Sequence, residues 1–256
     1  MNFRTLHMGN IVDIDVINAW CLLLNYNELL RSTNSPARFF ATVGVCLEST
    51  IQPPCNLAYN KRRDIFFRLL DAEISRIEHM SIENIDLFFF PMCRVLKYYT
   101  FCVDIKKEKV YVLDSQNELV DICQAAKYGT TTDLVKNMLA DYLAYKGHVH
   151  KSNVVKRSKL AIVHIKWGDA KNINDMGVYM MRHMETFMGD SSSLWTCGLA
   201  PKLRKQLNLL RVRYCAALIA WEKNSIRDAM EESAKLSFGS SFDDPNLNID
   251  VTLLGK

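Results

Sequence analysis

Eight cysteines and six histidines are the residues of this chain best suited to nucleophilic or metal chemistry. A cysteine is reactive only as the thiolate, which forms beside a base, a positive charge or a helix N-terminus. The cysteines are scattered without a CxxC pair, and His148-Val-His150 is the only tight histidine pair. This pair lacks cysteine or carboxylate partners at zinc spacing, so we expect no metal site and no cofactor. Scattered cysteines indicate free thiols in a reducing, intracellular compartment.

A second candidate site for chemistry is the polar turn that leads into Asp175-Met176-Gly177, where a helix is expected to begin. The free N–H groups at a helix start favour an anion, so a cysteine there would be activated. The residue present is Met176, whose thioether has no proton to lose. The apolar residues that follow recur at helical spacing and predict a buried stripe, not a cofactor-binding motif; they are Met180, Met181, Met184, Phe187 and Met188.

The elements that must position these residues follow from hydrophobic periodicity. Helical spacing predicts helices over 10–31, 62–78, 131–145, 176–188 and 200–226. Runs rich in aromatic and β-branched residues predict strands over 86–93, 98–105, 110–115 and 160–167, the second and third forming a hairpin. No linker divides the chain, so we expect one α+β domain over 10–226 and a flexible tail over 237–256.

Composition narrows the classes of function. The chain has 256 residues, of which 49% are hydrophobic and 23% charged, enough to bury a sizeable core. The net charge of +4 is small and spread along the chain, which does not predict a nucleic-acid partner. No apolar run reaches the roughly 18 residues of a membrane span, and residues 1–10 do not look like a signal peptide. We expect a monomer.

Four segments in order carry a resemblance to a known family. They are D-x-D-V-I-N-A-W at 13–20, K-Y-Y-T-F-C-V-D at 97–104, Y-V-L-D-S at 111–115, and Trp167 followed by D-M-G-V-Y-M-M-R-H-M-E at 175–185. Over residues 10–190 the chain resembles the catalytic domain of the ubiquitin-like-specific (SUMO) cysteine proteases, especially the divergent copies associated with plant transposable elements. The last segment is the most specific, because it differs from the family pattern mainly at Met176.

The resemblance implies a papain-like fold, a central mixed sheet flanked by helices, with a Cys-His-Asp triad. The aspartate position is Asp114, the histidine position is Lys97 and the cysteine position is Met176. The family's glutamine that binds the oxyanion would lie between Trp167 and Asn172, where there is none. The resemblance also places Asp13, Trp20 and Trp167 along a substrate groove, implies a ubiquitin-like modifier as partner, and implies a nuclear rather than cytoplasmic location.

These substitutions remove the expected chemistry. Methionine cannot form a thiolate, and a lysine is mostly protonated at neutral pH and a poor base. Lys97 could instead form a structural ion pair with Asp114. Each position also has a plainer interpretation: Asp114 can cap the turn after a strand, and His183 can be a structural histidine in the core. Cys93 would be a replacement nucleophile only if His164 or His183 reached it.

Three hypotheses follow for function. The first is a degenerate protease without peptidase activity, which either still binds a ubiquitin-like protein or is an element-derived remnant. The second is a working cysteine-type peptidase that uses an unexpected nucleophile. The third is a scaffold module unrelated to ubiquitin-like proteins. An open groove from Asp13 and Trp20 to Trp167 would favour retained binding, and a filled groove would favour a remnant.

Overall fold

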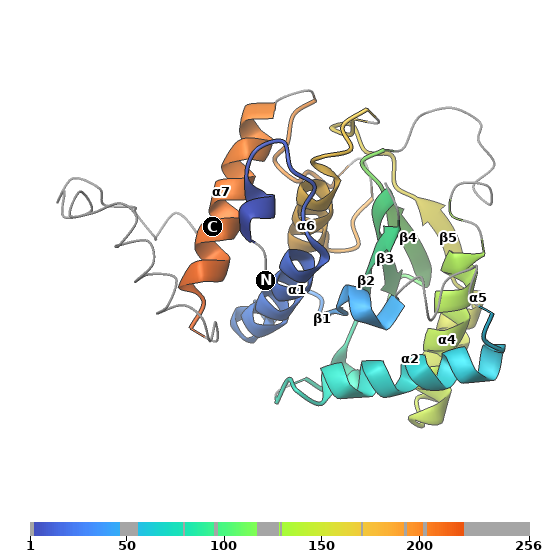
Figure 1. The fold of residues 1–256 in the computed structure, drawn as a ribbon. Helices are drawn as coiled ribbons and strands as arrows, with labels where there is room; N and C mark the ends of the chain where they lie inside the picture. Colours follow the sequence, from blue (N-terminus) through green and yellow to red (C-terminus); the bar gives the residue numbers. More distant parts are fainter. Residues whose placement is uncertain are drawn as a thin grey trace. The chain divides into compact units, whose positions relative to one another are not determined.

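A five-stranded mixed sheet forms the centre of the structure (Figure 1), a computed structural model that describes residues 3–46, 56–78, 80–94, 97–116, 128, 130–169, 171–191, 194–201 and 204–222. The strands lie in the order β1-β2-β3-β4-β5. The two inner pairings are antiparallel and the two outer pairings are parallel. The strands are β1 Arg38–Phe40, β2 Leu87–Arg94, β3 Lys97–Asp104, β4 Lys109–Leu113 and β5 Lys159–Ile162. The expected α+β class and the hairpin are confirmed.

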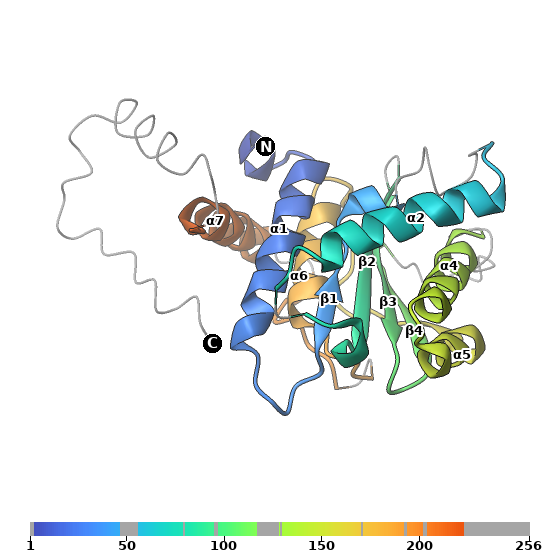
Figure 2. The same cartoon turned by 90° about the horizontal axis from the view of Figure 1, so that it is seen from below.

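Helices cover both faces of the sheet, and Figure 2 shows the two layers. On one side are α1 Ile14–Asn27 and α6 Met176–Thr186; on the other are α2 Tyr59–Ile74, α4 Thr131–Tyr145 and α5 Val149–Arg157. Successive strand residues point to opposite faces, so Phe88 and Phe90 enter the core beneath α2 and α4. Phe89, between them, stacks on Phe40 and meets Phe187 edge-on under α6. The continuous apolar run of β2 therefore fills two cores.

The helices expected over 10–31, 62–78 and 176–188 have other bounds, at Ile14–Asn27, Tyr59–Ile74 and Met176–Thr186. β5 and α5 differ more, for physical reasons. The strand expected over 160–167 ends at Ile162, because Ile162 pairs with Val112 and β4 ends one residue later. A strand cannot continue without a partner for its backbone groups. Helix α5 was missed because most of its nine residues are polar, and of its apolar residues only Val154 and Val155 are buried.

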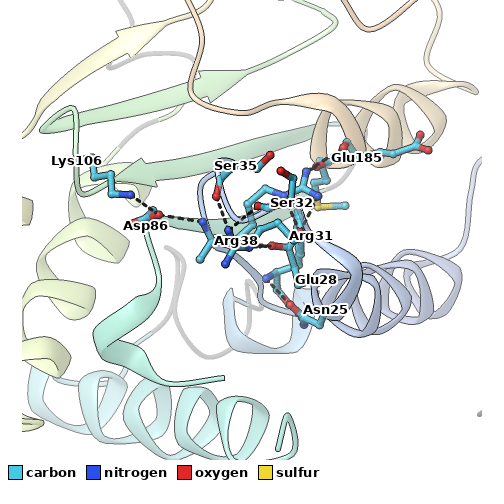
Figure 3. Close-up of polar contacts among 12 residues, drawn as sticks. Asn25, Glu28, Arg31, Ser32, Ser35, Arg38, Asp86, Lys106 and Glu185 are labelled. Atoms are coloured by element: carbon cyan, nitrogen blue, oxygen red, sulfur yellow. Dashed lines mark hydrogen bonds and ion pairs between the residues drawn. The ribbon is translucent and has the colours of Figure 1, made fainter. Parts of the chain in front are cut away.

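At the end of the sheet where β1 and β2 begin, a buried ion pair ties three elements together (Figure 3). Arg38 at the start of β1 donates from Nε to Glu28 Oε1 at 2.8 Å, just beyond the end of α1. Arg38 Nη1 also donates to the backbone oxygen of Glu185 at 2.9 Å, near the last turn of α6. Asn25 of α1 adds a side-chain bond to Phe40 O at 2.8 Å. These contacts fix α1 and α6 against the edge strand.

The remaining described α-helix is α7, Arg204–Ala220, inside the range expected for the C-terminal helix. Short 3-10 helices lie at Phe3–Leu6, Glu28–Leu30, Val43–Cys46 and Ile82–Asn84. The chain divides into two compact units, Met1–Tyr214 and Cys215–Lys256, so the boundary falls within α7. The tail expected over 237–256 lies outside the described residues. None of the helices that the structure describes is both long and apolar enough to cross a membrane.

Candidate functional site

The three positions that the family resemblance assigns to a catalytic triad lie at one end of the sheet. Lys97 is the first residue of β3, and Asp114 directly follows β4, which pairs antiparallel with β3. Met176 begins α6, and α6 packs against β3. The side chain of Lys97 is exposed, whereas Met176 is 1% and Asp114 is 4% exposed. The sequence order of the elements therefore brings the three positions to one region, but leaves only the lysine in solvent.

The head of α6 is tightly packed. A polar turn leads into it, in which Asn172 Nδ2 donates to Asp175 Oδ2 at 2.7 Å. Gly177 lies against Val12, and a Cβ on this glycine would approach the Val12 Cβ to 2.6 Å. That distance is shorter than real side chains allow, so the second helical position requires glycine. In the stripe that follows, Met180, Met181, Met184 and Phe187 are buried as their spacing predicted, whereas Met188 lies beyond the end of α6 and is partly exposed. Met176 is thus covered, not presented at an open helix start.

Asp114 is held by a tyrosine and by its own turn. Tyr128 donates its hydroxyl to Asp114 Oδ2 at 3.0 Å, and the Gln116 amide donates to Oδ1 at 2.7 Å. Burial, and then the charge of Asp114, raise the pKa of Tyr128 well above its usual value, so the hydroxyl stays protonated and able to donate. Tyr128 packs edge-on against Tyr99 of β3, with centroids 5.0 Å apart. Both contacts are those of a structural, turn-capping carboxylate.

His183 has the surroundings of a core histidine. Its Nε2 accepts a hydrogen bond from Trp167 Nε1 at 3.2 Å, and the ring also bonds to the backbone of Leu113. Complete burial lowers the pKa of His183 to about 3, so the ring is neutral at pH 7. With two partners engaged, this histidine is not free to serve as a base.

Cys93, the other candidate nucleophile, also lacks activation. Burial raises the pKa of its thiol far above the usual value, so the thiolate is scarce at neutral pH. His164, the second histidine that could have served it, has an exposed side chain. The described surroundings of Cys93 are those of an inert core cysteine.

The three residues expected along a groove have other contacts. Asp13 caps α1, and its carboxylate accepts from the Asp15 amide at 2.8 Å. Trp20 is 4% exposed and donates from Nε1 to Met181 O at 3.2 Å. Trp167 is 5% exposed and packs edge-on against Trp195. Both indoles lie in the interior and join α1, α6 and the following loop. That they line a substrate groove stays a prediction.

Sequence reasoning missed Tyr128 and Arg211. The guanidinium of Arg211, on α7, is 1% exposed and bonded to Asp175, the residue before Met176. A signal was present in the sequence: Arg211 interrupts an apolar helical stripe, and an arginine on a buried face requires acceptors. No comparable signal marks Tyr128, because its partner is fixed only once β4 and the chain before α4 are in place.

The fold is that of the Ulp1-like cysteine proteases. A de-sumoylating protease aligns with a TM-score of 0.56 and 11% identity, over 92% of this chain and 90% of that chain. The SUMO protease Ulp1 with its catalytic cysteine oxidised to a sulfenic acid aligns at 0.55 and 13%, over 84% and 81%.

The C-terminal Ulp1 protease domain in complex with Smt3, the yeast orthologue of SUMO, aligns at 0.52 and 16%, over 84% and 79%. No protein-family model matches the chain, and no curated protein matches it. At these identities the likeness shows the fold, and the residues at the site must be judged by their own chemistry.

Proposed function

We propose that this chain is a catalytically inactive protein of the SUMO-protease fold, which binds a ubiquitin-like modifier or its conjugates without cleaving them. The observation that carries the proposal is Met176, buried at the head of α6 where the family resemblance places the nucleophilic cysteine. A thioether cannot be deprotonated, so neither a thiolate attack nor an acyl-enzyme thioester is available at this position.

The other two positions assigned to the triad also support the proposed loss of catalysis. Lys97 is exposed and carries no imidazole, and Asp114 is already bonded to Tyr128 and to the Gln116 amide. The neutral histidine of this region, His183, is bonded to Trp167 and to the Leu113 backbone. A rescue of the reaction by a displaced cysteine is disfavoured, since burial keeps the Cys93 thiol protonated.

Binding is proposed from the fold. The Ulp1 domain that shares it was solved in complex with Smt3, and the likeness covers 84% of this chain. A fold can keep a binding surface after its chemistry is lost, because surface contacts and the catalytic residues are different side chains. A transposon-derived remnant with no partner is the competing outcome, and the interior positions of Trp20 and Trp167 are what favour it.

The test is equilibrium binding to a panel of immobilised ubiquitin-like proteins. Each modifier is presented twice, once with its C-terminal glycine free and once joined to a lysine side chain. The proposal predicts saturable binding to at least one modifier, which stays intact by mass spectrometry after prolonged incubation. Binding followed by cleavage would overturn the claim of inactivity. Absence of binding across the panel would overturn the claim of a modifier partner and favour a transposon-derived remnant with no partner.

A further inference from the structure

Arg211 is a saturated, buried hydrogen-bond donor that joins three distant segments. Its Nε and Nη2 both donate to Asp175 Oδ1, at 2.9 and 2.6 Å. Nη2 also donates to the backbone oxygens of Asn174 and Asn10, at 2.9 and 2.8 Å. Nη1 donates to the backbone oxygens of Thr5 and His7, at 3.0 and 3.2 Å. A planar guanidinium is suited to this task, because it presents five N–H groups in a fixed fork.

The N-terminal segment that Arg211 holds lies against the head of α6. Residues Thr5–Val12, called the strap below, contribute Val12, which is fully buried and packs on Gly177. The strap has a further bond to the start of α1, where the Asp13 amide donates to Thr5 Oγ1 at 3.1 Å. Asp175, whose carboxylate pairs with Arg211, immediately precedes Met176. One guanidinium therefore fixes both the strap and the residue that enters the helix.

We propose that the strap is a closed cover over the head of α6, latched by Arg211, and that Met176 becomes accessible only when the strap is released. Arg211 is then a positioning residue, acting through Asp175 and the strap backbone. The strap can also be destabilised without changing Arg211, because Gly9 has φ +81°, a backbone conformation that favours glycine. A side chain at Gly9 would meet nothing within 4 Å, so an alanine there strains only the backbone.

The test is methionine oxidation of the natural chain and of Gly9→Ala by dilute hydrogen peroxide, followed residue by residue by peptide mass spectrometry. Sulfoxide formation tracks access of the oxidant to each side chain. Met8, 56% exposed, is the reference for open access, and Met138, fully buried on the inner face of α4, is the reference for the closed core. Gly147→Ala is the matched control, because Gly147 has φ +86°, also has open space around a Cβ, and lies between α4 and α5.

The proposal predicts that Met176 oxidises at least about fivefold faster in Gly9→Ala than in the natural chain, the factor expected for about 1 kcal/mol of added strain. Met138 should not change, and Gly147→Ala should leave Met176 at its natural rate. Equal rates for Met176 in Gly9→Ala and the natural chain would overturn the proposal. A parallel rise of Met138 would also overturn it, since it would mean global loosening.

The Arg211→Lys variant tests the same proposal independently of Gly9. Lysine keeps the charge but donates three bonds from a single atom, so it cannot span the strap and Asp175 together. The same selective rise at Met176 is expected, with Met138 unchanged. If Arg211→Lys does not fold, the Gly9→Ala comparison decides the question by itself.

Discussion

The two ends of the sheet differ in the kind of residues that they hold. At one end, Glu28 and Arg38 form a buried ion pair that joins α1, β1 and the last turn of α6. At the other end, the positions that the family resemblance assigns to a histidine and a cysteine hold Lys97 and Met176. Yet the second end is no less ordered, because Asp114 and Arg211 are buried and fully engaged there.

The difference shows that positioning and reacting are separate tasks in this fold. The head of α6 is held by Arg211, Asp175 and the Val12–Gly177 contact, none of which is a triad position. Under the proposed function, loss of the nucleophile removes a reaction without removing a packing contact, and the helix that carried it persists. The ion-pair end has no such freedom, since each of its charged groups is a structural partner of the other.

The largest effect should follow from breaking the ion-pair end. Arg38→Met keeps most of the side-chain volume but leaves the Glu28 carboxylate, 5% exposed, without its main partner. We expect the free energy of unfolding to fall by about 3 kcal/mol, the lower end of the cost of breaking a buried ion pair, because Arg31 Nε remains 3.6 Å from Glu28 Oε2. Denaturant unfolding measures it. Arg157→Met, which removes the exposed Arg157–Glu108 pair, is the control and should leave the transition unchanged. Equal losses for the two variants would contradict this account.

A smaller and pH-dependent effect is expected from His183, beside the chemical end. The folded chain keeps this ring neutral with a pKa of about 3, whereas the unfolded chain binds a proton near pH 6.5. The stabilising contribution of the neutral ring is complete above pH 6.5 and is lost as the pH falls toward 3. Between pH 7 and 4.5 the natural chain should lose about 2.5 kcal/mol more than His183→Gln. Identical pH dependence in urea titrations would mean that the histidine is not held neutral.

The smallest expected effect on stability comes from a comparison of Tyr128 and Lys97, the two candidate partners of Asp114. Tyr128→Phe removes the hydroxyl that donates to Asp114 and should cost about 2 kcal/mol, as for a buried hydrogen bond to a charged group. Lys97→Met changes an exposed residue and should stay within about 0.5 kcal/mol. A double-mutant cycle with Asp114→Asn measures each coupling directly. A coupling for Lys97 as large as that for Tyr128 would instead establish the structural ion pair between Lys97 and Asp114.

Much of the scaffold could be predicted from the sequence because it depends on local patterns. The continuous apolar run Leu87–Met92 predicts a buried strand, and the apolar residues of α6 recur at helical spacing. The site was harder, because burial depends on contacts between distant segments. The low exposure of Trp20 and Trp167, for example, follows from contacts with α6 and with the loop after it, which no local pattern shows.

Two further contacts were beyond any local pattern. The bond between Tyr128 and Asp114 requires β4 and the approach to α4 to meet. The Arg211 cluster joins residues more than two hundred positions apart, from Thr5 to α7. The sequence indicated this cluster only through the charge of Arg211 within an apolar helical stripe, since a buried arginine requires acceptors.

The central claim is the loss of peptidase chemistry, and its most direct test is hydrolysis of ubiquitin-like proteins that carry a fluorogenic group on the C-terminal glycine. The natural chain should be compared with the Lys97→His, Met176→Cys double variant, and with a variant that lacks all eight cysteines as the zero reference. The account predicts no turnover by the natural chain above that reference, whatever the double variant does. Turnover by the natural chain that disappears with its cysteines would contradict it, and would show that one of the native thiols is a working nucleophile.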